Sequence, residues 1–161
     1  MLGDDVKVVR TMPNTPALVG EGMAALCPNA GVSKEDLADV EAIFNSFGKC
    51  EVITENLFDA VVGVSGSSPA YVYMFIEAMA DAAVADGLPR DKAYKFAAQA
   101  VLGSAKMVLE TGRHPGDLKD MVCSPGGTTI KAVIELENAG FRSAVMRGTE
   151  ACIEKSREMS K

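Results

Sequence analysis

Two glycines followed by two threonines, residues 126–129, are the residues of this chain best suited to hold a ligand. They stand directly before an apolar run, IKAVIEL, whose spacing is that of a helix. Backbone N–H groups at a helix start have no intrahelical partner and lie at the positive end of the helix dipole, so anions bind there. Glycine lets a ligand approach those groups because it has no Cβ. The pattern predicts an anion site, and two hydroxyls without an adjacent Lys or Arg favour a carboxylate.

Each candidate for chemistry also has a structural interpretation. The two glycines can simply form a turn, with Thr128 as an ordinary helix N-cap. His114 precedes a proline at a predicted helix start, which favours a structural role over general acid chemistry. Glu77 and Asp81 lie four residues apart on an apolar helix. A polar stripe on the helix surface is favoured there over a catalytic pair of carboxylates.

The cysteines are spread singly along the chain, at positions Cys27, Cys50, Cys123 and Cys152. With one histidine and no CxxC pair, the spacing of a zinc site is missing and no metal is predicted. Small buried side chains are the expected role of each thiol. Single cysteines and the lack of a secretory pattern at the start, MLGDDVKVVR, predict reduced thiols and a cytoplasmic protein.

Length and charge narrow the class of protein. The chain has 161 residues, enough for one domain or for a small domain with a piece of another. Its formal net charge of −6 and the lack of a basic stripe exclude nucleic acid as a partner. The sequence has no apolar run of the roughly 18 residues that a membrane span needs. The composition is that of a soluble globular protein.

The first 54 residues alternate strands with one helix. Strands are predicted at Val6–Val9, at MAALC (23–27) and at KCEVIT (49–54). The segment MPNTPALVGEG, rich in proline and glycine, reads as a loop. Ser33 and Asp36 resemble a capping box that begins a helix, and Gly48 fits its C-terminal cap. The helix presents apolar residues at Leu37, Val40, Ile43, Phe44 and Phe47. This order is that of the end of an α/β domain.

From residue 55 onward no strand pattern appears. Residues 58–66 read as helical or irregular, and helices are predicted at 70–86, 90–110, 115–122, 129–139 and 141–159. The helix at 129–139 is expected to turn Ile130, Val133, Ile134 and Leu136 inward. The helix at 70–86 is apolar on nearly all sides, and about 105 residues offer little to cover it. We therefore expect a homodimer in which helices of two chains interleave.

Four segments together carry a family likeness. MPNTPALVGEG, SGSSPAYVYMFIEAMADAAV, HPGDLKDMV and MVCSPGGTTIKAV resemble pyrroline-5-carboxylate reductase in order and spacing over nearly the whole chain. The resemblance implies an N-terminal Rossmann domain, here represented by residues 1–54, and an all-helical dimerisation and substrate-binding domain, here residues 55–161. The fold class is then mainly α, preceded by the last strand–helix–strand elements of the α/β domain. Family members form homodimers that often associate into decamers.

The same resemblance implies an activity and its residues. The family reduces the imine of 1-pyrroline-5-carboxylate to L-proline with NADPH or NADH, the last step of proline biosynthesis. The implied substrate-binding residues are Ser124, Pro125, Gly126, Gly127, Thr128 and Thr129. Thr129 matches the threonine near the imine nitrogen, whereas Thr128 stands where other members carry alanine. The implied cofactor-binding residues, against the nicotinamide, are Met12, Pro13, Asn14, Thr15 and Pro16, with Asn14 the best polar candidate.

The chain departs from the family pattern in two places. Ser68 replaces a glycine in the SGSSPA stretch. More important, the sequence has no GxGxxG after an early strand, so the main dinucleotide-binding region is missing. The sequence thus resembles the C-terminal portion of the enzyme, and we expect it to be inactive alone. The alternatives are a non-catalytic dimerisation module and a small protein that binds a carboxylate at the GGTT helix start.

Overall fold

The computed structural model describes residues 6–160, which fall into two compact units. The first unit contains the chain up to Ala70 together with the part from Arg147 onward, and the second is Tyr71–Met146. Each unit is described separately below. Within the described residues, no helix combines the length and the apolar character that crossing a membrane requires.

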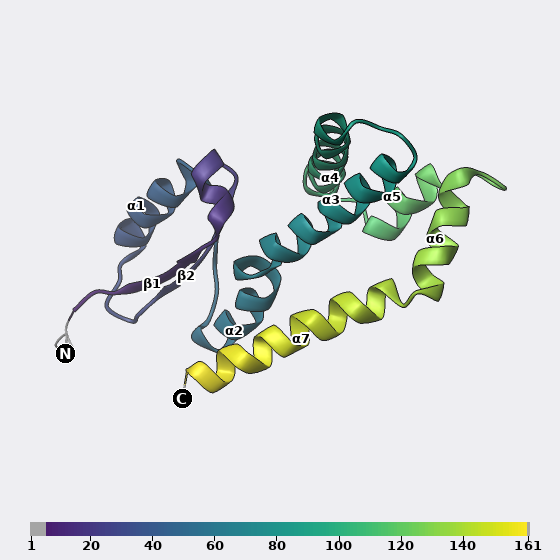
Figure 1. The fold of residues 1–161 in the computed structure, drawn as a ribbon. Helices are drawn as coiled ribbons and strands as arrows, with labels where there is room; N and C mark the ends of the chain where they lie inside the picture. Colours follow the sequence, from purple (N-terminus) through teal and green to yellow (C-terminus); the bar gives the residue numbers. More distant parts are fainter. Residues whose placement is uncertain (1–5, 161) are drawn as a thin grey trace. The chain divides into compact units, whose positions relative to one another are not determined.

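A three-stranded sheet organises the first unit (Figure 1). The strands β1 (Val9–Pro13), β2 (Gly22–Pro28) and β3 (Gly48–Val52) lie in the order β1-β2-β3. β1 runs antiparallel to β2, and β3 runs parallel to it. The central strand supplies the core of the sheet through Ala24, Ala25 and the fully buried Leu26. The predicted order of strand, loop, strand, helix and strand is confirmed.

The first strand begins later than predicted. β1 covers Val9–Pro13, and residues 6–8 lie outside it. The side-chain amide of Asn29 occupies the backbone groups there, because its Oδ1 accepts from the N–H of Val8 at 3.2 Å and its Nδ2 donates to the carbonyl of Val6 at 2.8 Å. The strand in turn extends through part of the expected loop, and a 3₁₀ helix, η1 (Thr15–Val19), completes that segment.

A helix, α1 (Lys34–Asn45), connects β2 to β3. Its capping box is confirmed: Ser33 Oγ accepts from the N–H of Asp36 at 3.1 Å, and the Asp36 carboxylate accepts from the N–H of Ser33 at 3.1 Å. The prediction that Gly48 caps the helix is wrong. The helix ends at Asn45 with Ser46 as its C-cap, and Gly48 begins β3, where a Cβ would overlap the carbonyl of Gly22 on the neighbouring strand.

An irregular helical segment follows the sheet. It consists of η2 (Glu55–Leu57), α2 (Phe58–Val61) and a π-helical turn, η3 (Val62–Gly66). The C-terminal half of α7 (Phe141–Met159) packs on it: Ser156 Oγ donates to Asp59 at 2.6 Å, and Cys152 Sγ lies 3.1 Å from Ser67 Oγ. The buried Gly63 allows this approach, since a Cβ there would lie 2.6 Å from Ile153. These contacts join residues that are about 90 positions apart in the chain.

The second unit is built only from helices in its described residues. It contains α4 (Arg90–Thr111), α5 (Pro115–Val122) and α6 (Thr128–Asn138), with most of α3 (Ser68–Ala85) and the start of α7. Glycines in the left-handed conformation, Gly87, Gly112 and Gly140, lie where helices were predicted to end. The predicted fold class, mainly α after a few α/β elements, is confirmed.

Apolar side chains of the second unit are poorly covered within one chain. Its buried residues are three alanines, Ala80, Ala93 and Ala97. On α3, Tyr73 is 60% exposed and Met74 is 69% exposed. The expectation for α6 holds only in part: Ile130 and Val133 are half-buried, whereas Ile134 and Leu136 are exposed. The helices therefore present more apolar surface than the unit itself covers.

Candidate functional site

The predicted substrate-binding residues lie in the connection between α5 and α6 and in the first two residues of α6. Gly126 takes the left-handed conformation, with φ +71°, which side chains rarely adopt. The N–H of Gly127 donates to the carbonyl of Ser124 at 3.0 Å and closes a turn. A Cβ on Gly127 would collide with the Ser124 hydroxyl and come within 3.1 Å of its carbonyl oxygen. The turn thus favours glycine at both positions, Gly126 for its positive φ and Gly127 for the limited space beside Ser124.

The turn leaves the N-terminus of α6 without a side-chain cap. Gly127, rather than Thr128, is the N-cap residue, so the interpretation of Thr128 as an ordinary cap is wrong. A glycine cap has no hydroxyl to accept from the first N–H groups of the helix, those of residues 128–130. Thr128 is exposed and Thr129 is half-buried. The arrangement offers unpaired backbone donors, with one partly enclosed hydroxyl beside them.

The predicted cofactor loop lies in the first unit, at the end of β1. Met12 and Asn14 are half-buried, whereas Pro13 and Thr15 are exposed. Asn14 is held on both sides of its amide. Its Oδ1 accepts from the N–H of Met23 at 2.9 Å, and its Nδ2 donates to Ser65, at 3.3 Å to both the carbonyl and the hydroxyl oxygen. The spacing of these residues in the sequence does not predict these contacts.

The alternative candidates for chemistry have structural partners. His114 is the N-cap of α5, and its Nδ1 accepts from the N–H of Gly116 at 3.0 Å. Asp81 forms an ion pair with Arg90, whose guanidinium lies 5.6 Å from the centre of the Tyr94 ring. The hydrogen bond to Asp81 raises the pKa of Arg90. The structural interpretation of His114 and Asp81 fits these contacts.

The pKa values of two thiols, Cys27 and Cys50, are raised, whereas that of the capping carboxylate, Asp36, is lowered. Burial raises the pKa of Cys27, and the nearby Glu55 carboxylate adds to the increase. Burial likewise raises the pKa of Cys50, so neither thiol is activated as a nucleophile. Hydrogen bonds from the ammonium of Lys7 and from Ser33 lower the pKa of Asp36 to about 2. Among the described residues, no cluster of three or more His, Cys, Asp or Glu side chains could hold a metal ion.

The fold and the turn define a class of protein: the last elements of an α/β domain followed by helices, with a glycine-capped helix start at α6. A family model described as pyrroline-5-carboxylate reductase dimerisation matches residues 55–159. The chain belongs to this family, as the four sequence segments predicted.

Named relatives and solved structures agree with this assignment. The chain is 68% identical to pyrroline-5-carboxylate reductase of Escherichia coli (strain K12) over 99% of its length, and 51% identical to that of Synechocystis over 98%. It covers 60% and 59% of those two proteins. A crystal structure of Plasmodium falciparum pyrroline carboxylate reductase with NADP bound is similar at a TM-score of 0.91 and 42% identity, over 100% of this chain and 65% of that one. The Coxiella burnetii reductase gives a TM-score of 0.94 at 35% identity, over 99% of this chain and 60% of that one.

Proposed function

We propose that this chain forms the substrate-binding and dimerisation part of a pyrroline-5-carboxylate reductase, which reduces 1-pyrroline-5-carboxylate to L-proline. The observation that carries the proposal is the glycine-capped start of α6, which lies within the matched residues 55–159. The chain spans about 60% of the length of the curated relatives, and its 161 residues contain no glycine-rich dinucleotide fingerprint. We therefore expect the chain alone to be inactive and propose the activity for the protein in which this part joins a dinucleotide-binding part.

The proposed chemistry assigns separate tasks to the α6 turn. The N–H groups of residues 128–130 bind the substrate carboxylate, since they lack partners and carry the positive end of the helix dipole. Ser124 and Pro125 shape the turn that exposes them. Thr129, as the proposed catalytic residue, hydrogen-bonds the imine nitrogen and orients the ring. The nicotinamide cofactor, when bound, supplies the hydride that adds to the imine carbon while the nitrogen takes a proton.

For the cofactor we propose NADPH or NADH, with the loop of residues 12–16 against the nicotinamide. A relative with 42% identity binds NADP in its crystal structure, which supports this class of cofactor. The exposed Pro13 and Thr15 leave one side of the loop accessible. Positioning is the contribution we assign to the loop, because the cofactor itself carries the difficult chemical step. All four cysteines are free thiols, which supports the proposal that the protein works in the reducing cytoplasm.

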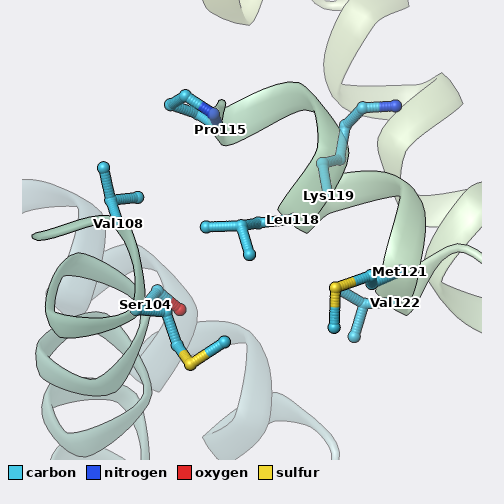
Figure 2. Close-up of a pocket in the computed structure, with 8 residues that line it drawn as sticks. Ser104, Val108, Pro115, Leu118, Lys119, Met121 and Val122 are labelled. Carbon is cyan, nitrogen blue, oxygen red and sulfur yellow. The ribbon is translucent and has the colours of Figure 1, made fainter. Parts of the chain in front are cut away.

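We propose that the chain forms a homodimer. Association of dimers into a higher oligomer such as a decamer is a further step of the same proposal. Apolar side chains exposed on α3 support it, as does an apolar groove of about 490 Å³ between α4 and α5. Figure 2 shows Leu118 of α5 lying between the two helices and facing Ser104 and Val108 of α4. We assign both surfaces to a second copy of the chain. The division into residues 1–54 and 55–161 is part of this proposal.

Proline binding tests the carboxylate site. We expect L-proline to raise the melting temperature of the chain, and Thr129→Ala to weaken proline binding about tenfold because one hydrogen bond is lost. Thr128→Ala is the matched control and should bind like the original chain, because its hydroxyl is exposed. Gly127→Ala should abolish binding through the clash with Ser124. Equal proline binding by Thr129→Ala and Thr128→Ala would contradict the proposed role of Thr129. Unchanged proline binding by Gly127→Ala would contradict a carboxylate site at the start of α6.

NADPH oxidation with pyrroline-5-carboxylate tests whether activity requires both this chain and a dinucleotide-binding part. The chain alone should give no measurable turnover, and adding the dinucleotide-binding part should produce it. Turnover by the 161 residues alone would contradict the proposed need for a separate cofactor-binding part. Proline binding without turnover in the joined protein would favour the alternative of a protein that only binds a carboxylate.

A further inference from the structure

Pro69 leaves one backbone carbonyl without its helical donor. In an α-helix the N–H of residue i+4 donates to the carbonyl of residue i, and proline has no N–H. The α-helical register of α3, extended back into the π-helical turn η3, pairs residue 69 with the carbonyl of Ser65, and Pro69 is unable to donate to it. The neighbouring carbonyl, that of Val64, accepts from the Ser68 hydroxyl at 2.5 Å. A side-chain donor thus reaches a carbonyl group of the turn at the point where the backbone hydrogen bonds of the helix are interrupted.

Asn14 supplies the donor that Pro69 lacks. Its Nδ2 lies 3.3 Å from the Ser65 carbonyl oxygen and 3.3 Å from the Ser65 hydroxyl, across 51 positions of sequence. The other end of the amide is fixed, because the N–H of Met23 only donates and so requires Oδ1 to face it, at 2.9 Å. The amide orientation follows from this contact, with the NH₂ group toward Ser65.

We propose that Asn14 is a positioning residue that locks the loop of residues 12–16 onto the π-helical turn by replacing the hydrogen bond that Pro69 is unable to make. Both polar atoms of its amide are engaged within the protein, so Asn14 acts through the placement of the loop. A Cβ built on Gly66 would lie 3.9 Å from Met12 Sδ, so the loop passes within the reach of one added methyl group from the turn. The function of the placed loop rests on the proposed function, but the lock itself does not.

Amide hydrogen exchange by NMR on the whole chain tests the lock. Asn14→Asp keeps an acceptor for the Met23 N–H but puts an oxygen against the Ser65 carbonyl. We expect about tenfold less protection at two reporters. These are the Ala17 N–H, which donates to the Asn14 carbonyl at 3.2 Å, and the Ser67 N–H, which donates to the Val62 carbonyl at 2.9 Å. The Leu37 N–H in α1, which donates to Ser33, is the internal reference for global opening and should not change.

A second substitution makes the test specific. Pro69→Ala restores a backbone N–H that can donate to the Ser65 carbonyl, so the loss caused by Asn14→Asp at the Ser67 N–H should shrink to about twofold or less in the double variant. Ser65→Ala removes only the hydroxyl acceptor and should change the protection by less than about threefold. If Asn14→Asp alone does not fold, a folded double variant supports the lock.

Three outcomes would overturn the inference: unchanged protection of Ala17 and Ser67 in Asn14→Asp, a loss that Pro69→Ala does not reduce, or a double variant that also fails to fold. These measurements need neither substrate nor cofactor. If the Asn14 contact behaves as expected but the protein has no reductase activity, the proposed function is refuted and the inference about Asn14 stands. If the protein is active but the Asn14 contact has no effect on protection, the inference is refuted and the proposed function stands.

Discussion

Truncating one exposed methionine on α3 should weaken the proposed dimer by about two orders of magnitude. Met74 is 69% exposed in the single chain. Complete burial of a methionine side chain contributes about 2 kcal/mol, so covering the exposed part of Met74 in both copies contributes about 3 kcal/mol. Since about 1.4 kcal/mol is a factor of ten, Met74→Ala should raise the dimer dissociation constant about 100-fold.

Sedimentation velocity over a dilution series measures this change. The original chain should remain a dimer at micromolar concentration, and Met74→Ala should dissociate at concentrations where the original does not. Leu18→Ala is the matched control: Leu18 is an apolar side chain that is 90% exposed, but it lies outside the matched residues 55–159. A monomeric original chain would refute the proposed dimer, and an equal effect of both substitutions would refute the assignment of the α3 face.

Three further substitutions test local packing and electrostatics. Gly63→Ala should destabilise the chain by about 1–3 kcal/mol in urea unfolding, because its Cβ would lie 2.6 Å from Ile153. Gly66→Ala is the control, since its Cβ would meet only ordinary contacts. Equal losses of unfolding free energy in the two variants would contradict this packing. The pKa of Asp36 is lowered to about 2, so its contribution to the free energy of unfolding is complete above its unfolded pKa and is lost as the pH falls from about 4 to 2. Asp36→Asn should therefore flatten the plot of unfolding free energy against pH between about 4 and 2. An unchanged slope in that range would contradict the lowered pKa of Asp36. His114→Ala should cost about 1 kcal/mol through loss of the α5 cap, with His114→Asn as the variant that retains an acceptor.

Local sequence signals predicted the elements well where the deciding residues are neighbours. The capping box of Ser33 and Asp36 involves residues three positions apart, and it formed as predicted. Gly87, Gly112 and Gly140 take positive φ at helix ends because glycine, having no Cβ, adopts that conformation without steric cost. The start of β1 was misplaced, since the side chain of Asn29, more than 20 positions away, holds the preceding backbone.

The proposed substrate site was partly accessible to sequence reasoning. The glycines before α6 marked the correct turn, and the family model covers that region. Their individual roles are visible only in the tertiary structure: Gly126 takes a positive φ, whereas Gly127 makes room for Ser124. Asn14 was identified only as a polar residue beside the cofactor, and the missing donor at Pro69 was the overlooked signal of its contact with Ser65.

The sequence by itself determined the order of strands and helices, the glycine-capped turn and the family, because these depend on short-range patterns and on segments retained in order. Only the tertiary structure decided why Gly48 and Gly63 are glycines and what holds Asn14. Gly48 lies against Gly22 on the neighbouring strand, and Gly63 lies against Ile153 in the last helix. The physical reason is that steric exclusion and side-chain hydrogen bonding act between atoms that are close in space, and the identity of such a neighbour is not contained in the residues adjacent in the chain.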